Sequence, residues 1–390
     1  MTPFRAALFA LYVLWSGPAV SQALPADYWR QPLWPQGDAP VGWSPDERSL
    51  KPEDCGGCHR DKFEEWKTSL HARAFSPGLV GQLLSYDAEE AAACLRCHAP
   101  LAEQRQAFEA ARIRGKAHRT DNQGLAAAGN SCGGCHVRDH RRFGPPQRHS
   151  GAVGHGDPAG SHGGVTRTAD FEKSEFCAGC HQFPQDQAIN GKPLENTVAE
   201  WRASPAAAEG KACQTCHMPD RKHLWRGIHD PDMVWGGLTP EFTAETGWAR
   251  FRLTSTGVGH AFPTYVTPKV VMKAVALDHA GRPIGGSERG HVIQRRVEFV
   301  AGQWVERSDT RLAPGQSAVL EMAWPKSGRV RMWLEVYPDD FYDHQVYAPL
   351  SRTLPNESPV AGLIAEASRR AKGSRFRLFE TQLRRPVAPN

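Results

Sequence analysis

The sequence lacks three features, and each absence excludes a class of protein. None of its ten cysteines lies outside one repeated pentapeptide, so no thiol is left over for structural disulfides. Beyond residue 23, no apolar run is long enough to cross a bilayer. The chain also has no run of lysines and arginines, which argues against a nucleic-acid-binding protein.

The repeated pentapeptide is Cys-x-x-Cys-His, and it occurs five times. At this spacing two thiols form thioether bonds to the vinyl groups of a haem, and the adjacent imidazole reaches the iron. One C-x-x-C could be a redox dithiol or half of a zinc site. From the composition, however, chance predicts only about 0.01 matches, and a zinc array does not require histidine after every second cysteine.

The motifs therefore predict five covalently attached haem c groups, each with a cysteine pair and a proximal iron ligand. The haem-attaching residues are Cys55, Cys58, Cys94, Cys97, Cys132, Cys135, Cys177, Cys180, Cys213 and Cys216, and the ligands beside them are His59, His98, His136, His181 and His217.

Residues 1–23 have the pattern of a secretory signal peptide. Arg5 lies in a short basic start, an apolar stretch follows over residues 6–15, and small residues surround a cleavage site near Ala23. We expect the mature protein to be periplasmic or secreted, which fits the attachment of c-type haem after export. No cysteine follows directly to carry a lipid, so we expect no membrane anchor in the mature chain.

The formal net charge of +5 overstates the basicity of the mature protein. Removal of the signal peptide takes away Arg5 and leaves +4. The propionates of each haem add about −1 to −2 by formal counting. The holoprotein should thus be near neutral or mildly acidic, and partners should be redox proteins, with no role for nucleic acid.

Composition divides the chain after the signal peptide into four parts. Residues 24–50 are rich in proline and tryptophan and form an extension expected to lie over the surface. Residues 51–238 carry all five motifs, and with so few residues per cofactor the macrocycles must supply much of the buried apolar mass. This part should be mainly α, with short helices and long loops around a haem stack.

A change of pattern near residue 239 predicts a second domain. Residues 239–355 alternate polar and apolar side chains between Gly/Pro/Asp-rich turns, which indicates an all-β sandwich-like domain. Residues 356–390 should form a C-terminal helix and tail. The predicted strands are 249–254, 269–277, 291–299, 318–324 and 329–336.

The ligand opposite each motif histidine decides what each iron can do. Two imidazoles make an iron that only passes electrons, whereas an open position can bind a substrate. Six methionines are too few and too badly placed to be the general ligand. Twelve histidines outside the motifs are enough for five irons.

His71 is the best candidate, because it flanks an apolar helical stripe that follows the first motif. Twelve residues of helix separate it from His59 by about 18 Å, so it should serve a different haem. His260 lies in a Gly-rich turn ending at Pro263 and would join the β-region to the haem stack.

The other candidate distal ligands lie in loops that each hold more than one histidine. At least one of His223 and His229 should bind iron, and the tight loop around Gly227 favours His229. In the loop 143–164, His149, His155 and His162 compete, and His162 is preferred; the alternative is a solvated His-rich loop with no ligand. His118 and His140 are lesser candidates, whereas His279, His291 and His344 should be structural.

The first motif followed by Phe63, Trp66 and Ser69–Ala72 resembles the opening of cytochrome c-554-like multihaem cytochromes. These are relatives of the hydroxylamine oxidoreductases and pentahaem nitrite reductases. The segments from Cys213 to His229 and from Gly259 to Thr264 are similar to patterns in larger members. The resemblance implies a multihaem cytochrome c fold, periplasmic electron transfer and His71 as a distal ligand. No Lys variant of the motif is present, so the nitrite reductase mechanism is not implied.

Three functions remain open on the sequence. The first is an electron relay through mostly bis-His haems. The second is an oxidoreductase that acts on a small nitrogen or sulfur compound at one five-coordinate haem. The third is a redox subunit that docks to a larger complex through the β-domain.

Overall fold

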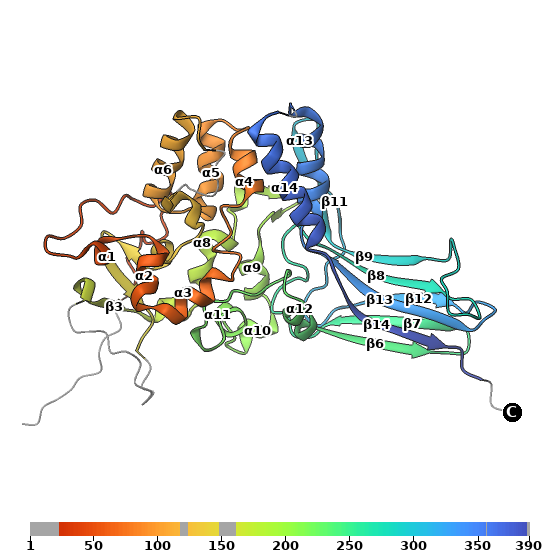
Figure 1. Cartoon of the computed structure of the whole chain (residues 1–390). Coiled ribbons are helices and arrows are strands. Elements are labelled where there is room, and N and C mark those ends of the chain that lie inside the picture. The colour runs from red at the N-terminus through yellow and green to blue at the C-terminus, as the bar shows by residue number, and fades with distance from the viewer. Residues whose placement is uncertain (1–22, 118–123, 148–160, 356, 388–390) are drawn as a thin grey trace, which may run out of the picture.

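The structure is a computed structural model, and it describes residues 23–117, 124–147, 161–355 and 357–387. Figure 1 shows a helical region, from the N-terminus to α12, beside a region of long antiparallel strands. The predicted fold class, a mainly α haem-motif region followed by a β-sandwich, is confirmed. The predicted signal peptide lies outside the described residues except for Ala23.

Short helices joined by long loops build the haem-motif region. The haem motifs themselves form helix ends, because two cysteines three residues apart and the next histidine occupy one helical turn. The helices are α1 Pro45–Arg48, α2 Pro52–Cys58, α3 Arg60–Lys67, α4 Pro77–Leu83, α5 Ala88–His98, α6 Ala102–Ile113, α7 Cys132–His136, α8 Ala178–His181, α9 Thr197–Arg202, α10 Pro205–Ala208, α11 Cys213–His217 and α12 Pro231–Gly237.

Sheet is minor in this region. β1 (Val137–Arg138), β2 (Arg141–Gly144) and β3 (Val165–Arg167) form a small sheet, and β4 (Ala188–Ile189) pairs with β5 (Lys192–Pro193). The extension 24–50 does more than cover the surface, since Tyr28 and Leu33 are buried.

Two antiparallel sheets form the sandwich. One has the order β12-β7-β6, and the other has the order β14-β13-β8-β9. Inward side chains such as Phe251, Met272 and Met332 pack between the sheets in one core, as the alternating sequence requires. The strands are β6 Leu238–Ala244, β7 Trp248–Ser255, β8 Lys269–Ala276, β9 Arg289–Ile293, β12 Ser317–Ala323, β13 Arg329–Tyr337 and β14 Phe376–Arg384, with the hairpin β10 Arg295–Val300 and β11 Gln303–Asp309 beside them.

The C-terminal segment returns to both regions. A π-helical turn (η7, Tyr342–Tyr347), α13 (Ala348–Thr353) and α14 (Pro359–Gly373) lead back over the helical region, where α14 packs against α4 (Figure 1). β14 then pairs with β13 at the edge of the sandwich. The predicted C-terminal helix is therefore present, but the segment after it is a strand of the sandwich and not a tail.

Candidate haem-binding site

Three histidines from outside the motifs face three motif histidines. His71 lies opposite His181, with ring centroids 6.3 Å apart. The rings of His136 and His223 are 6.1 Å apart, and those of His217 and His260 are 6.4 Å apart. Each pair joins residues far apart in the chain, so the fold brings the rings together.

The separation of these rings matches two imidazoles on one iron. Metal–nitrogen bonds near 2 Å place the two ligating nitrogens about 4 Å apart, and each ring centroid lies about 1.1 Å further out, which gives about 6 Å in all. Imidazoles on a common axis can adopt any mutual twist. The interplanar angles of 11°, 28° and 41° are therefore all compatible with axial ligation.

Backbone carbonyls orient the imidazoles. The Nδ1 atoms of His98, His136 and His217 lie 3.0, 2.8 and 2.6 Å from the carbonyl oxygens of Ala74, Phe143 and Arg226. Among the opposing histidines, His223 and His260 make the same kind of contact with Arg221 and Ala261. An Nδ1–H that donates to a carbonyl leaves Nε2 as the lone-pair nitrogen, which is the state that binds a metal.

Burial keeps these rings neutral. It lowers the pKa of His71 to about 3 and the pKa values of His181, His223 and His260 to about 4. The pKa of His136 is lowered for the same reason. Because only a neutral imidazole offers a lone pair, burial prepares these side chains for iron.

His59 and His98 have no facing histidine ring among the described residues. The nearest sequence candidate for the first motif is His162, whose backbone N–H donates to Glu47 of α1 at 2.9 Å, one helix away from α2. Its Nδ1 is buried without a hydrogen-bond partner. The backbone of His162 has a positive φ of 39°, in the left-handed region. His118, His149 and His155 lie outside the described residues.

His229 occupies a different place from the one predicted. Its Nε2 lies 3.0 Å from both carboxylate oxygens of Asp339, at the start of the turn before η7. His223, and not His229, faces a motif histidine. The loop around Gly227 therefore places the His229 side chain against Asp339.

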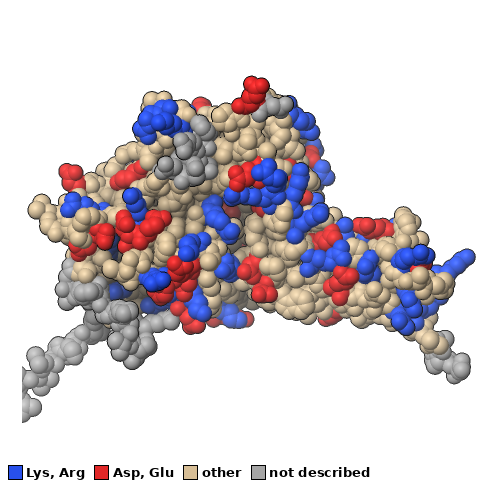
Figure 2. All heavy atoms as spheres, in the orientation of Figure 1, with Lys and Arg blue, Asp and Glu red and all other residues tan. Residues whose placement is uncertain are grey.

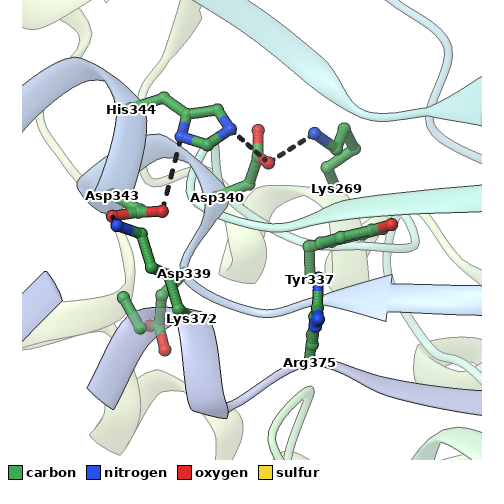
Figure 3. A pocket seen from close by; sticks show the side chains of 9 residues that line it. Lys269, Tyr337, Asp339, Asp340, Asp343, His344, Lys372 and Arg375 are labelled. Atoms are coloured by element: carbon green, nitrogen blue, oxygen red, sulfur yellow. Dashed lines mark hydrogen bonds and ion pairs between the residues drawn. The ribbon is translucent and has the colours of Figure 1, made fainter. Parts of the chain in front are cut away.

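Asp339 also borders a cavity of about 310 Å³ between the sandwich and α14 (Figure 3). Other carboxylates that line this cavity already have partners: Asp340 contacts Lys269, and Asp343 contacts Ser368 and His344. Among the described residues, no group of His, Cys, Asp and Glu side chains forms a metal site. The lining residues are Lys269, Tyr337, Asp339, Asp340, Asp343, His344, Ala371, Lys372 and Arg375.

The thiols show which motifs are neighbours. Hydrogen bonds join Cys55 to Cys132, Cys97 to Cys180 and Cys177 to Cys213. The first motif thus lies against the third, the second against the fourth, and the fourth against the fifth.

Two cysteines, one in the first motif and one in the fifth, are more exposed than the others. Cys58 of the first motif and Cys216 of the fifth are exposed, whereas the other eight cysteines are half-buried. Over the face drawn in Figure 2, acidic and basic side chains are interleaved, and no surface of a single sign dominates it.

The residues present fit haem c in three ways: paired thiols at motif spacing, facing imidazoles at the separation of axial ligands, and Nδ1 atoms held by carbonyls. Fold and site together define a multihaem c-type cytochrome. No described helix has the length and apolar character needed to cross a membrane.

Comparison with known proteins agrees with this class. Residues 54–136, which hold the first three motifs, match the family model for cytochrome c554 and c-prime, so the predicted resemblance is confirmed there. The fold matches the crystal structure of a penta-heme cytochrome c552 from Thermochromatium tepidum, with a TM-score of 0.57 and 20% identity. The match covers 80% of this chain and 96% of that one, and at this identity it shows the fold. No curated protein matches the sequence.

Proposed function

We propose that this protein carries five covalent haem c groups and relays electrons between redox proteins, mostly through bis-His irons. Each haem supplies an iron that takes up and releases one electron. The observation that carries the proposal is the set of three imidazole pairs, 6.1 to 6.4 Å apart. Irons held on both sides by imidazole have no open position, so they favour electron transfer over substrate chemistry.

The neighbouring motifs support a connected relay. The thiol contacts give the adjacency first–third and second–fourth–fifth. Tyr28 donates to the carbonyl of Cys135 at 2.6 Å, and the adjacent Trp29 packs on Gly179, so the third motif also neighbours the fourth. The five motifs therefore form one connected set, in which the fourth motif neighbours the second, the third and the fifth.

Haem count and spin state test this proposal. We expect pyridine haemochrome analysis to give five haems per chain and electron paramagnetic resonance to show mainly low-spin iron. The variant H223A should convert one haem to high spin, and its matched control H229A should leave the haem spectra unchanged. A haem content well below five, or a spectral change in H229A instead of H223A, would contradict the proposal.

A second candidate function rests on the surroundings of the second motif. Instead of a facing histidine, the described residues near Cys94 and Cys97 include the buried Glu195 and the half-buried Tyr265 and Tyr342. Burial raises the pKa of Tyr342 to about 12 and that of Glu195 to about 7, so both can be neutral proton donors. One five-coordinate haem here could act on a small nitrogen or sulfur compound.

Ligand binding separates the two functions. Addition of nitrite, hydroxylamine or CO should change the spectrum of one haem if this site is open. Fully low-spin iron that binds none of them would exclude the oxidoreductase.

We also propose export to the periplasm or beyond. The signal-like pattern of residues 1–23 supports it. N-terminal sequencing of the haem-loaded protein should begin near Leu24, and an intact Met1 would contradict export by signal cleavage.

A further inference from the structure

Arg138 is a cation enclosed by backbone carbonyls. Its Nε donates to the carbonyl of Tyr28 at 2.9 Å, and its Nη1 donates to those of Gly134 and Val137 at 3.1 and 2.6 Å. Its Nη2 is buried and has no hydrogen-bond partner. Among the described residues, no carboxylate lies within the 4.0 Å of an ion pair.

Two aromatic rings hold the guanidinium in this place. It lies 4.1 Å from the ring centroid of Tyr28 and 5.2 Å from that of Trp29. Aromatic faces and carbonyl oxygens attract a cation but carry no net charge of their own. Arg138 is half-buried, and the nearby carboxylate that acts on it is that of the exposed Asp139, with which it forms no ion pair.

This charge lies between the third and fourth motifs. Gly134, whose carbonyl accepts from Arg138, is part of the third motif, and the Tyr28 hydroxyl binds the carbonyl of Cys135 in the same motif. On the other side, Trp29 packs on Gly179 of the fourth motif so closely that a Cβ there would lie 3.1 Å from the indole. The extension 24–50 thus wedges the arginine between two haem attachment sites.

Other buried arginines of this chain are neutralised. Arg295 in the β-region has a fully buried side chain and pairs with Glu306 at 2.7 Å. Arg311 is 5% exposed and pairs with Glu200 and Asp309, each at 2.9 Å. Arg138 lacks such a partner, as does the half-buried Arg142, whose guanidinium donates to the carbonyls of His140 and Glu47.

We propose that Arg138 is a fixed positive charge that raises the reduction potentials of the haems attached at the third and fourth motifs. The inference rests on the proposed function, since it requires haem at those cysteines. Reduction adds an electron, and a nearby cation stabilises the reduced state through an interaction that burial shields from salt.

Neutral replacements test the proposal. In R138Q or R138M, the potentials of two haems should fall by about 59 mV, equivalent to about a ten-fold change in the equilibrium constant of a one-electron couple. The other three potentials should be unchanged. R138K keeps the charge and should retain the native potentials. Redox titration followed by the NMR signals of individual haem methyl groups provides the measurement.

R295Q is the matched control, because it removes a buried arginine that has its own carboxylate partner. It should lower stability without shifting any haem potential. Neutral Arg138 variants that contain five haems but show five native potentials, or an equal shift of all five, would overturn the inference. A chain that holds no haem at all would instead contradict the proposed function, so the two failures are distinguishable.

Discussion

At the scale of single residues, Glu195 is the buried acid with the clearest consequence. Its carboxylate accepts a hydrogen bond from Thr197, whose hydroxyl also contacts Thr264. The residue is 9% exposed, and burial raises its pKa from 4.5 to about 7. The folded protein therefore binds a proton that the unfolded chain has already released at neutral pH.

The variant E195Q should remove this proton linkage. Because the pKa is raised on folding, Glu195 stabilises the protein fully below about pH 4.5 and loses that contribution as the pH rises to about 7. The shift sets an upper bound of about 3 kcal/mol. E195Q should thus gain stability relative to the natural protein more at about pH 8 than at about pH 5. Chemical unfolding followed by circular dichroism measures it.

The exposed Glu64 supplies the control for this experiment. E64Q should follow the pH dependence of the natural protein, since its partner Lys67 lies with it at the surface. If E195Q and E64Q show the same pH slope, the proton linkage of Glu195 is refuted.

At the scale of elements, the contact between α4 and α14 depends on two small residues. Gly78 and Gly81 of α4 lie directly beneath α14 and the turn η7. A Cβ on Gly78 would lie 2.7 Å from Cζ of Tyr347 and 3.0 Å from Cβ of Ala367. The absence of side chains here lets the C-terminal helix close on the haem-motif region.

We expect G78A to destabilise the protein by about 1 to 3 kcal/mol, because the new methyl group must displace an aromatic ring in a packed interface. G362A on α14 is the matched control, as nothing lies within 4 Å of its Cβ position. That change should stabilise the protein by up to about 1 kcal/mol through helix propensity. Thermal unfolding of both variants provides the comparison, and a neutral G78A would contradict the packing.

The strands show how far local pattern predicts this fold. Strands with clear alternation, such as β7 and β12, are close to their predicted ranges. β11 was missed because its exposed pattern gives no apolar face. β14 was missed because its strand pairing with β13 is a long-range event and only Phe379 of its residues is deeply buried. A tertiary partner, not the local sequence, defines both.

Phe379 connects this last strand to the sandwich. It is 6% exposed, and its ring lies 4.4 Å from that of Trp235 in α12. F379A should cost about 3 to 5 kcal/mol and leave the edge of β13 open to aggregation. E380A, on the outer face of the same strand, should cost less than about 1 kcal/mol. Equal effects of the two variants on the unfolding midpoint would show that β14 does not contribute to the core.

At the scale of the whole molecule, the candidate site is assembled from both regions. His260 comes from the connection between β7 and β8, yet its ring faces His217 of α11. The sequence identified the motif residues, because haem attachment fixes their spacing. It could not rank His223 against His229, because both lie in one short loop and only the fold determines which ring faces His136.

Acid should release the buried imidazoles together. The pKa values of His71, His181, His223 and His260 are lowered from 6.5 to between about 3 and about 4. For a lowered histidine pKa, the unfolded chain binds more protons, so stability is full above about pH 6.5 and falls as the pH drops toward the folded values. This slope is opposite to that of Glu195, and four imidazoles outweigh one carboxyl where the two ranges overlap, so stability should be greatest at about pH 6.5 to 7.

We therefore expect the holoprotein to lose its low-spin absorbance in one steep acid transition, with several protons taken up together, because an iron-bound imidazole can take up a proton only after it leaves the iron. An acid titration monitored in the haem bands measures the midpoint and its steepness. H344A is the control, since that side chain is 60% exposed and should leave the midpoint unchanged. A shallow, single-proton transition would mean that the imidazoles protonate independently, and that these rings are not held by a shared buried array.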